Sequence, residues 1–174
     1  MYLRITPCRF LPALCLLFVF GAGCSTVPRP RAYNIQIDLD PALGTGSNQV
    51  DLIGANSSDL AKWSSYSMTD YWRADDAKRR DADKVVMRFG QGNSSVQTLL
   101  TIDPSWTRWE ATGAQYLVVL LQLSGVATDR EGNADPRRLI LPLDRREWGR
   151  DVSTIELRVQ ESGIRLMSPR KYRK

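Results

Sequence analysis

Apolar and polar residues alternate along most of the chain that follows residue 32. At residues 34–40 the alternation places Ile35, Ile37 and Leu39 on one face, and residues 154–160 repeat the pattern. A period of two is typical of a strand with one buried face. Together with the apolar segment 116–123, segments of this kind give eight predicted strands, at residues 34–40, 49–54, 84–89, 96–102, 116–123, 138–143, 154–160 and 163–167.

The composition of individual segments predicts where some of these strands lie in a sheet. Segment 116–123 is almost wholly apolar, which is typical of a central strand buried on both faces. Pro142 indicates a strand end or a sheet edge, because proline cannot donate to the ladder. The glycine-containing turn at residues 90–95 joins two predicted strands, 84–89 and 96–102, and favours a hairpin between them.

Helical signals concentrate between the second and third predicted strands. Residues 57–59 offer an N-cap before Leu60 and Trp63, residues 67–72 predict a second short helix, and the charged segment 75–83 predicts a turn or an exposed helical segment. Asp103 followed by Pro104 predicts a single helical turn at residues 103–109. Short strands with one helical insertion predict a mainly β, single-domain β-sandwich over residues 33–168.

The N-terminus has the organisation of a secretory signal peptide. Arg4 and Arg9 precede an apolar run at residues 11–20, and small residues at 21–23 lead directly to Cys24. The run is shorter than the roughly 20 residues that a spanning helix needs, which disfavours a transmembrane anchor or a buried core helix. An ordinary signal peptide without lipidation is the alternative that stays open.

The order of small residues and cysteine resembles the lipobox of bacterial lipoproteins. That resemblance implies cleavage after Gly23 and a covalent lipid on Cys24, which would anchor the mature chain in a membrane; no other cofactor and no metal are expected. Cys8 and Cys15 would be removed with residues 1–23, so no intramolecular disulfide could form. Residues 25–32, with two prolines, then predict an extended tether that begins at the lipidated residue.

Ser25 stands where an aspartate commonly retains lipoproteins at the inner membrane, so the resemblance favours the periplasmic side of the outer membrane. The inner membrane and a surface-exposed leaflet are the alternatives.

The net charge of +5 includes Arg4 and Arg9, which leaves +3 after cleavage. Much of it lies in the basic tail at residues 169–174. Such a tail could bind anionic lipid headgroups, glycan or an acidic partner, although a solvated terminus is the favoured interpretation. Nucleic acid is not an expected partner of an exported protein.

The chain has no histidine, which removes the commonest general base and the usual zinc ligand. We therefore expect a protein that is not an enzyme. Catalysis by carboxylates alone is the remaining chemical alternative, with candidates at Asp38, Asp40, Asp51, Asp70 and Asp103. Acidic residues also alternate at 129–135 as in a calcium loop, but the glycine is misplaced, and a solvated connection is the favoured interpretation.

Aromatic residues form two groups in the sequence. Trp63, Tyr66, Tyr71 and Trp72 lie in the helical insertion, and Trp106 and Trp109 follow the fourth predicted strand. Aromatic side chains are enriched in binding hot spots, so either group could form a glycan, ligand or partner surface. The alternative, that the rings close one end of the sandwich core, is favoured because large aromatics dominate core burial.

The order of elements resembles the type VI secretion lipoprotein (TssJ) family, whose fold is a transthyretin-like β-sandwich on the outer membrane. The resemblance rests on residues 50–54 as second strand, residues 63–72 as helical excursion and residues 116–123 as long apolar strand. It implies contact with the periplasmic part of an inner-membrane partner through the loop after the first strand. That loop corresponds to residues 41–48, where Leu43 is the large side chain. Our hypothesis is therefore a non-enzymatic envelope lipoprotein that acts by protein–protein contact; a ligand- or glycan-binding lipoprotein is the alternative.

Overall fold

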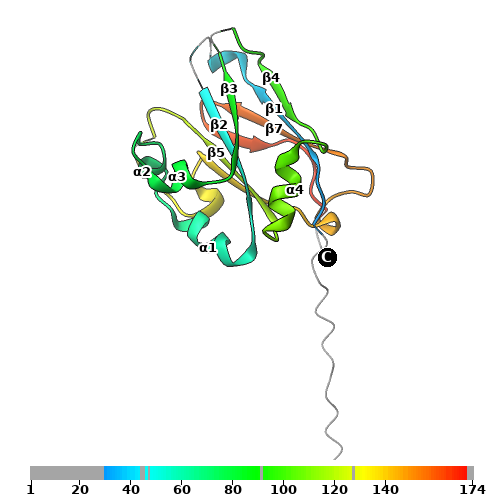
Figure 1. Ribbon diagram of the computed structural model, residues 1–174. Helices are drawn as coiled ribbons and strands as arrows, with labels where there is room; N and C mark the ends of the chain where they lie inside the picture. Colours follow the sequence, from blue (N-terminus) through cyan, green and yellow to red (C-terminus); the bar gives the residue numbers. More distant parts are fainter. Residues whose placement is uncertain (1–29, 44–45, 47, 91, 127, 172–174) are drawn as a thin grey trace, which may run out of the picture.

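Two four-stranded sheets pack face to face in the computed structural model, which describes residues 30–43, 46, 48–90, 92–126 and 128–171 (Figure 1). The predicted mainly β-sandwich with a helical insertion is confirmed. The first sheet has the strand order β4-β1-β7-β8, with bounds β1 Asn34–Leu39, β4 Val96–Leu99, β7 Thr154–Gln160 and β8 Gly163–Leu166. The second has the order β3-β2-β5-β6, with bounds β2 Asn48–Ala55, β3 Lys84–Phe89, β5 Tyr116–Leu121 and β6 Arg138–Pro142.

Strand pairing is antiparallel except between β1 and β7, which run parallel with Ile35 opposite Ile155. The inner faces follow from the alternation of each strand. Ile35, Ile37 and Leu39 of β1 point into the space between the sheets, where they join buried residues of the other strands. This single apolar layer forms the main core, and its burial is the principal stabilising contribution to the fold.

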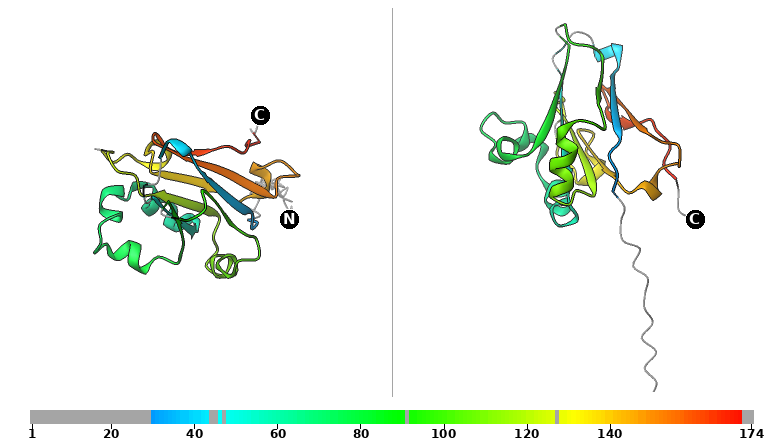
Figure 2. Two further views of the ribbon diagram at one scale, coloured as in Figure 1. Left: turned by 90° about the horizontal axis from the view of Figure 1, so that it is seen from above. Right: turned by 45° about the vertical axis from the view of Figure 1, so that its right-hand side comes forward.

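Strand β5 is buried on both faces, as its continuous apolar sequence predicts. Leu117, Val119 and Leu121 belong to the core between the sheets, whereas Val118 and Leu120 belong to a second apolar cluster on the outer face. The helical insertion covers that outer face (Figure 2). Strand β6 lies at the edge of the same sheet and ends at Pro142, which agrees with the prediction for this proline.

The predicted hairpin between residues 84–89 and 96–102 is wrong. Strand β3 pairs with β2, and β4 pairs with β1, so the two strands belong to different sheets and residues 90–95 cross from one sheet to the other. Strand β4 also ends at Leu99, because the backbone turns there and the N–H of Asp103 donates to the carbonyl of Leu100 at 3.0 Å.

The α-helices are α1 Ser57–Ser65, α2 Met68–Tyr71, α3 Ala77–Asp81 and α4 Pro104–Ala111. The described residues also form short 3₁₀ turns: η1 Pro41–Leu43, η2 Gly132–Ala134 and η3 Arg145–Glu147. The N-cap of α1 is Asn56 rather than a residue of the segment 57–59, since its side chain accepts from the N–H of Asp59. Helix α4 begins with Asp103 as cap and Pro104 in its first turn, as expected, but extends beyond a single turn.

Helix α4 packs closely against β2 at Gly54. An added Cβ at this glycine would lie 2.3 Å from Cγ of Trp109, so a residue with a side chain does not fit without displacement of the ring. The indole of Trp109 is buried in the main core and donates to the carbonyl of Asp83 at 3.1 Å. A glycine in β2 therefore lets the helix close that end of the sandwich.

The described chain begins and ends at the same end of the sandwich. Pro30 forms an isolated bridge with Asp144, and Trp148 forms another with Arg170. Strand β1 runs away from this end, so the described residues between β1 and β2 (40–43 and 46) lie at the opposite end, together with the described residues between β3 and β4 (Figure 1). We call the first the terminal end and the second the loop end. No helix in the described part of the chain is long and apolar enough to cross a membrane.

Candidate interaction surface

The helical insertion is fixed to the sheet by an apolar cluster and by buried polar groups. Trp63, Met68 and Tyr71 pack on the outer-face residues of β2 and β5. Trp63 meets Tyr71 edge-on at 6.2 Å between ring centroids, and the ammonium group of Lys78 lies 4.2 Å from the centroid of the Trp63 ring. These contacts make α1, α2 and α3 a packed layer on the second sheet.

Asp51 joins β2 to this layer. Its carboxylate is fully buried and accepts from Gln49 Nε2 at 2.7 Å, Tyr71 OH at 2.9 Å and Arg79 Nε at 3.3 Å. Burial, with the negative charge of Asp51 beside the hydroxyl, raises the pKa of Tyr71. The Arg79 guanidinium also lies 4.5 Å from the Trp72 ring. Every oxygen of this carboxylate is thus engaged in holding α2 and α3, which is a structural role.

The connection between β5 and β6 carries a second buried ionic group. Arg137 donates to both oxygens of buried Asp135, and its guanidinium also pairs with Asp129. Asp129 accepts from the backbone N–H of Thr69 at 3.1 Å and from the hydroxyls of Thr69 and Ser67. Burial opposes ionisation of Asp129, but these hydrogen bonds outweigh it and lower the pKa to about 2. The connection is therefore bound to α2, and neither the calcium-loop nor the solvated interpretation describes it.

Arg138 is buried, and no carboxylate of the described residues forms an ion pair with its guanidinium. It donates to the carbonyls of Trp63 at 2.9 Å, Tyr66 at 2.8 Å and Gly132 at 3.0 Å, and also to that of Arg130. A cation at this place complements the negative end of α1. Burial lowers the pKa of Arg138, but the carbonyl oxygens supply the hydrogen bonds that a buried charge needs.

The carboxylates considered for catalysis have structural partners. Asp103 caps α4, and Asp40 accepts from the N–H of Ala42 at 3.0 Å. Asp70 lies beside Arg73 at 3.6 Å, and Asp38 beside Arg158 at 3.9 Å. Residues 30–43, 46, 48–90, 92–126 and 128–171 contain no group of three or more acidic or cysteine side chains that could hold a metal ion.

The aromatic side chains considered for ligand contact lie largely inside the protein. Trp106 and Trp109 are 3% and 1% exposed and meet edge-on at 5.1 Å, so they fill the core beneath α4. Trp63 is 8% exposed, whereas Trp72 is partly exposed under Arg79. The placement of these rings corresponds to the alternative in which they close the core, and it leaves little ring surface for a glycan.

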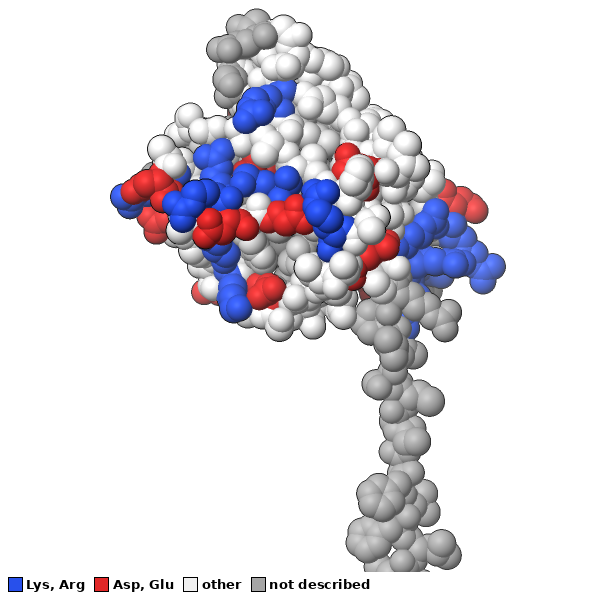
Figure 3. All heavy atoms as spheres, in the orientation of Figure 1, with Lys and Arg blue, Asp and Glu red and all other residues white. Residues whose placement is uncertain are grey.

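The loop end presents a surface of small, mostly uncharged residues. Pro41 and Ala42 are exposed on η1, whereas Leu43 is partly buried and packs against the main core. Residues 92–95 of the connection between β3 and β4 are exposed as well and carry no charge. Figure 3 shows few Lys, Arg, Asp or Glu side chains over the described part of this end. Contact here would depend on shape and hydrogen bonds rather than on charge.

Edge strand β4 and the segment after it add apolar surface that runs from the loop end toward the terminal end. Val96 and Leu100 are 43% and 49% exposed, and Ile102 is 85% exposed. An edge strand leaves backbone N–H and C=O groups along one side available to another chain. Exposed apolar side chains on such a strand are typical of a place where a partner strand or loop binds.

Cys24 and the cleavage position at Gly23 lie outside the described residues, so their roles stay predictions. Of the predicted tether, Arg31 is hydrogen-bonded through its N–H to the carbonyl of Leu143 at 3.1 Å, and Ala32 packs against the core. In the basic tail, the N–H of Lys171 donates to the carbonyl of Glu147 at 2.9 Å. A solvated terminus therefore does not describe Arg170 and Lys171, which bind the body of the domain.

The sequence matches no protein-family model and no curated protein. Among solved structures, a chain of a "Type VI membrane complex" superposes with a TM-score of 0.52 at 14% identity, over 80% of this chain and 99% of that chain. Serratia marcescens Lip, described as a membrane-bound component of the type VI secretion system, gives 0.47 at 15% identity, over 81% of this chain and 99% of that chain. The type VI secretion lipoprotein TssJ1 from Pseudomonas aeruginosa gives 0.49 at 13% identity, over 81% and 98%. Scores below 0.5 carry no weight, and identities this low concern the fold alone. The expected resemblance to proteins of type VI secretion systems is confirmed as a likeness of fold.

Proposed function

We propose that this protein is a bacterial envelope lipoprotein that holds and contacts another envelope protein, without catalysing a reaction. A lipid on Cys24 anchors it at the outer membrane, and the domain faces the periplasm. Its partner is the periplasmic part of an inner-membrane protein, and together they belong to a type VI secretion membrane complex. The signal-peptide pattern, the lipobox resemblance and the likeness of fold to a chain of a type VI membrane complex support this proposal.

The observation that carries the proposal is the opposite placement of the terminal end and the loop end. Pro30 enters the domain beside Asp144, six residues after Cys24. Six residues reach at most about 20 Å, so the terminal end stays close to the lipid. Strand β2 starts at the loop end and runs the length of the sandwich over eight residues, and at about 3.3 Å per residue it spans about 25 Å. The loop end is thus presented to the periplasm.

Site-specific crosslinking in cells tests the contact. A photo-crosslinking amino acid is placed at Ala42 on η1 or, as a matched control, at Ala111 at the end of α4; both alanines are exposed, and Ala111 lies toward the terminal end. We expect a defined adduct with one envelope protein from Ala42 and none from Ala111. The same adduct from both positions, or none from either, would contradict the proposed use of the loop end.

A third probe position separates the loop end from the β4 edge. Leu100 is exposed on the segment that follows β4 and lies beside the beginning of β1, away from η1 and toward the terminal end. An adduct from both Ala42 and Leu100 with the same protein would show that the partner extends along the edge strand. An adduct from Leu100 alone would transfer the contact from the loop end to that edge.

A further inference from the structure

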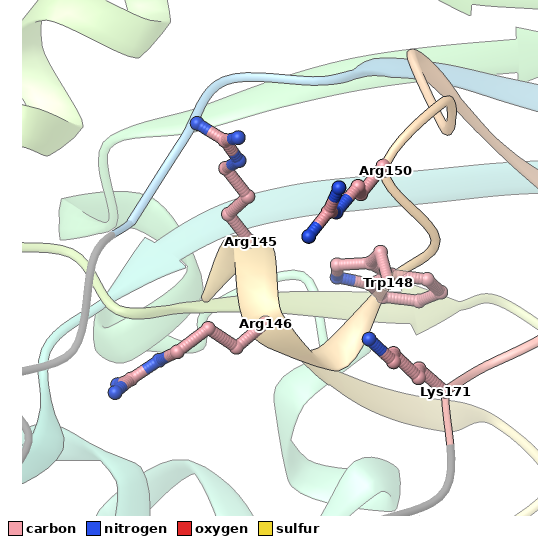
Figure 4. A pocket seen from close by; sticks show the side chains of 5 residues that line it. All are labelled: Arg145, Arg146, Trp148, Arg150 and Lys171. Atoms are coloured by element: carbon pink, nitrogen blue, oxygen red, sulfur yellow. The ribbon is translucent and has the colours of Figure 1, made fainter.

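A cleft at the terminal end is lined almost entirely by basic side chains. Arg145 and Arg146 of η3, Arg150 of the following loop and Lys171 of the C-terminal segment surround a cavity of about 310 Å³ (Figure 4). Trp148 is the fifth lining residue. Figure 3 shows Lys and Arg side chains gathered over η3 and the loop that follows it, beside the beginning of the described chain. None of the described residues that line the cleft carries a carboxylate.

The positive charge of this cleft is only partly compensated. Arg146 pairs with Asp144 at 2.6 Å, but no ion pair reaches Arg145, Arg150 or Lys171 from residues that the structure describes. The exposed cations of the helical insertion differ, because Lys62, Arg73 and Arg80 each lie beside an aspartate. Three uncompensated cations around one small cavity favour an anion with several oxygen atoms.

The side chains are presented by a fixed frame. The Trp148 ring is 1% exposed, donates through Nε1 to the carbonyl of Pro142 at 2.9 Å and meets Tyr33 at 6.1 Å between ring centroids. The bridge between Trp148 and Arg170, with the hydrogen bond from Lys171 to Glu147, holds the C-terminal segment against η3. Backbone contacts thus bring residues 145–150 and residue 171 to one place, although they are distant in sequence.

The cleft also lies where the chain approaches the membrane. The bridge between Pro30 and Asp144 places the entry of the chain next to Arg145, and the N–H of Arg31 donates to the carbonyl of Leu143 at 3.1 Å. Six residues separate Pro30 from Cys24, which limits the distance from the lipidated residue to about 20 Å. Basic groups act on a charged surface within a Debye length of about 8 Å at physiological ionic strength, so a domain drawn down to the membrane by its tether would place these cations among the headgroups.

We propose that the cleft of Arg145, Arg150 and Lys171, with Arg146, binds the phosphate groups of anionic lipid headgroups. Guanidinium groups match phosphate because their parallel N–H groups donate to two oxygens at once, and the lysine adds a point charge. The orientation rests on the proposed anchor at Cys24, but the cleft itself does not. Its function would be to fix the terminal end on the membrane, so that the loop end points away from it.

Vesicle binding tests the proposal. The full chain carrying Cys24→Ala, which removes the lipid, is mixed with phosphatidylcholine vesicles with and without phosphatidylglycerol. The test variant is the triple substitution Arg145→Gln, Arg150→Gln, Lys171→Gln. The matched control removes the same charge at three other exposed cations without an ion pair in the described chain, as Arg88→Gln, Arg130→Gln, Arg165→Gln. Each cation near an anionic surface raises the affinity about fivefold. We therefore expect the affinity of the cleft variant for phosphatidylglycerol vesicles to fall about 100-fold.

The control variant should keep most of its phosphatidylglycerol-dependent binding. Equal losses in both triple variants, or no loss in the cleft variant, would overturn the proposal. Inorganic phosphate and an acidic peptide are tested as competitors. Cleft-dependent binding of inorganic phosphate without a preference for phosphatidylglycerol would assign the cleft to free phosphate, and stronger binding of the peptide would assign it to an acidic protein. Failure of lipid labelling at Cys24 with intact cleft-dependent vesicle binding would reject the anchor and leave the cleft standing.

Discussion

Replacing Asp51 by alanine removes the carboxylate that joins β2 to α2 and α3. In the wild-type protein this fully buried group accepts from the side chains of Gln49, Tyr71 and Arg79 at 2.7 to 3.3 Å. The substitution leaves the Tyr71 hydroxyl inside the protein without its acceptor. Arg79 keeps some contact with water, because its side chain is 23% exposed.

The expected loss of stability follows from the different burial of Tyr71 and Arg79. A buried donor left without a partner costs about 1–3 kcal/mol. Loss of one partner from a wholly buried ion pair costs about 3–5 kcal/mol, and the partial exposure of Arg79 reduces that figure. We therefore expect Asp51→Ala to lower the free energy of unfolding by about 3 kcal/mol. For a domain of this size that corresponds to a fall in Tm of roughly 10 °C.

Urea denaturation at pH 7, followed by circular dichroism and tryptophan fluorescence, measures the loss. Asp51→Asn retains an acceptor for Tyr71 and should cost less, about 1 kcal/mol. The double variant Asp51→Ala, Tyr71→Phe should lose less stability than the sum of the single variants, with a coupling of about 1 kcal/mol.

The comparison variant is Asp38→Ala. Asp38 is a half-exposed aspartate, 3.9 Å from Arg158, and its loss should change stability by less than about 0.5 kcal/mol. If Asp51→Ala cost no more than Asp38→Ala, Asp51 would not hold the insertion to the sheet, and the reasoning would be refuted.

Three further predictions concern packing, acid stability and the buried cation. Gly54→Ala should destabilise the protein by about 3 kcal/mol in urea, since the new methyl group overlaps the ring of Trp109; an unchanged midpoint would contradict this packing. Asp129 has a pKa lowered from 3.8 to about 2. Its contribution to the free energy of unfolding is therefore complete above pH 3.8 and is lost as the pH falls toward 2. Allowing for its partial exposure, the wild type should lose about 1–2 kcal/mol more than Asp129→Asn between pH 4 and pH 2, and parallel pH profiles would be the contrary result. Arg138→Met should cost about 3 kcal/mol and increase proteolysis within α1, because the carbonyls at the end of α1 lose their donor; proteolysis at the wild-type rate would argue against it.

The sequence predicts strands well where alternation reports burial directly. Strands β3 and β7 have the predicted bounds, and β5 is buried on both faces as its composition indicates. Alternation reports which face of a strand is buried, but it does not report which strand lies beside it. The hairpin between β3 and β4 was therefore the wrong pairing, since a turn rich in glycine and serine also serves to cross between two sheets.

The buried polar groups were harder to predict for a related reason. Arg137 and Arg138 are adjacent, and a pair of arginines in a sequence usually indicates exposed surface. In this fold the connection 128–137 returns to the helical insertion, so both guanidinium groups find oxygen partners far away in sequence. The spacing of Asp129 and Asp135, which resembles a calcium loop, was the sequence feature that could have pointed to buried carboxylates. Their positively charged partner is Arg137 rather than a metal ion.

The basic cleft at the terminal end also depends on residues that are distant in sequence. Arg145, Arg146 and Arg150 form a basic segment in the sequence, but the closeness of Lys171 depends on the bridge between Trp148 and Arg170. Such long-range juxtapositions follow from tertiary packing. The loop end was predictable only through the resemblance of the element order to a known family.

Palmitate labelling combined with membrane fractionation tests the central claim most directly. Cells that express the wild-type chain or Cys24→Ala are grown with labelled palmitate, and the outer-membrane, inner-membrane and soluble fractions are compared. We predict label on the wild-type protein in the outer-membrane fraction, and an unlabelled Cys24→Ala protein that leaves that fraction. Wild-type protein without label, or a Cys24→Ala variant that stays labelled at the outer membrane, would contradict the account of a domain held at the membrane by Cys24.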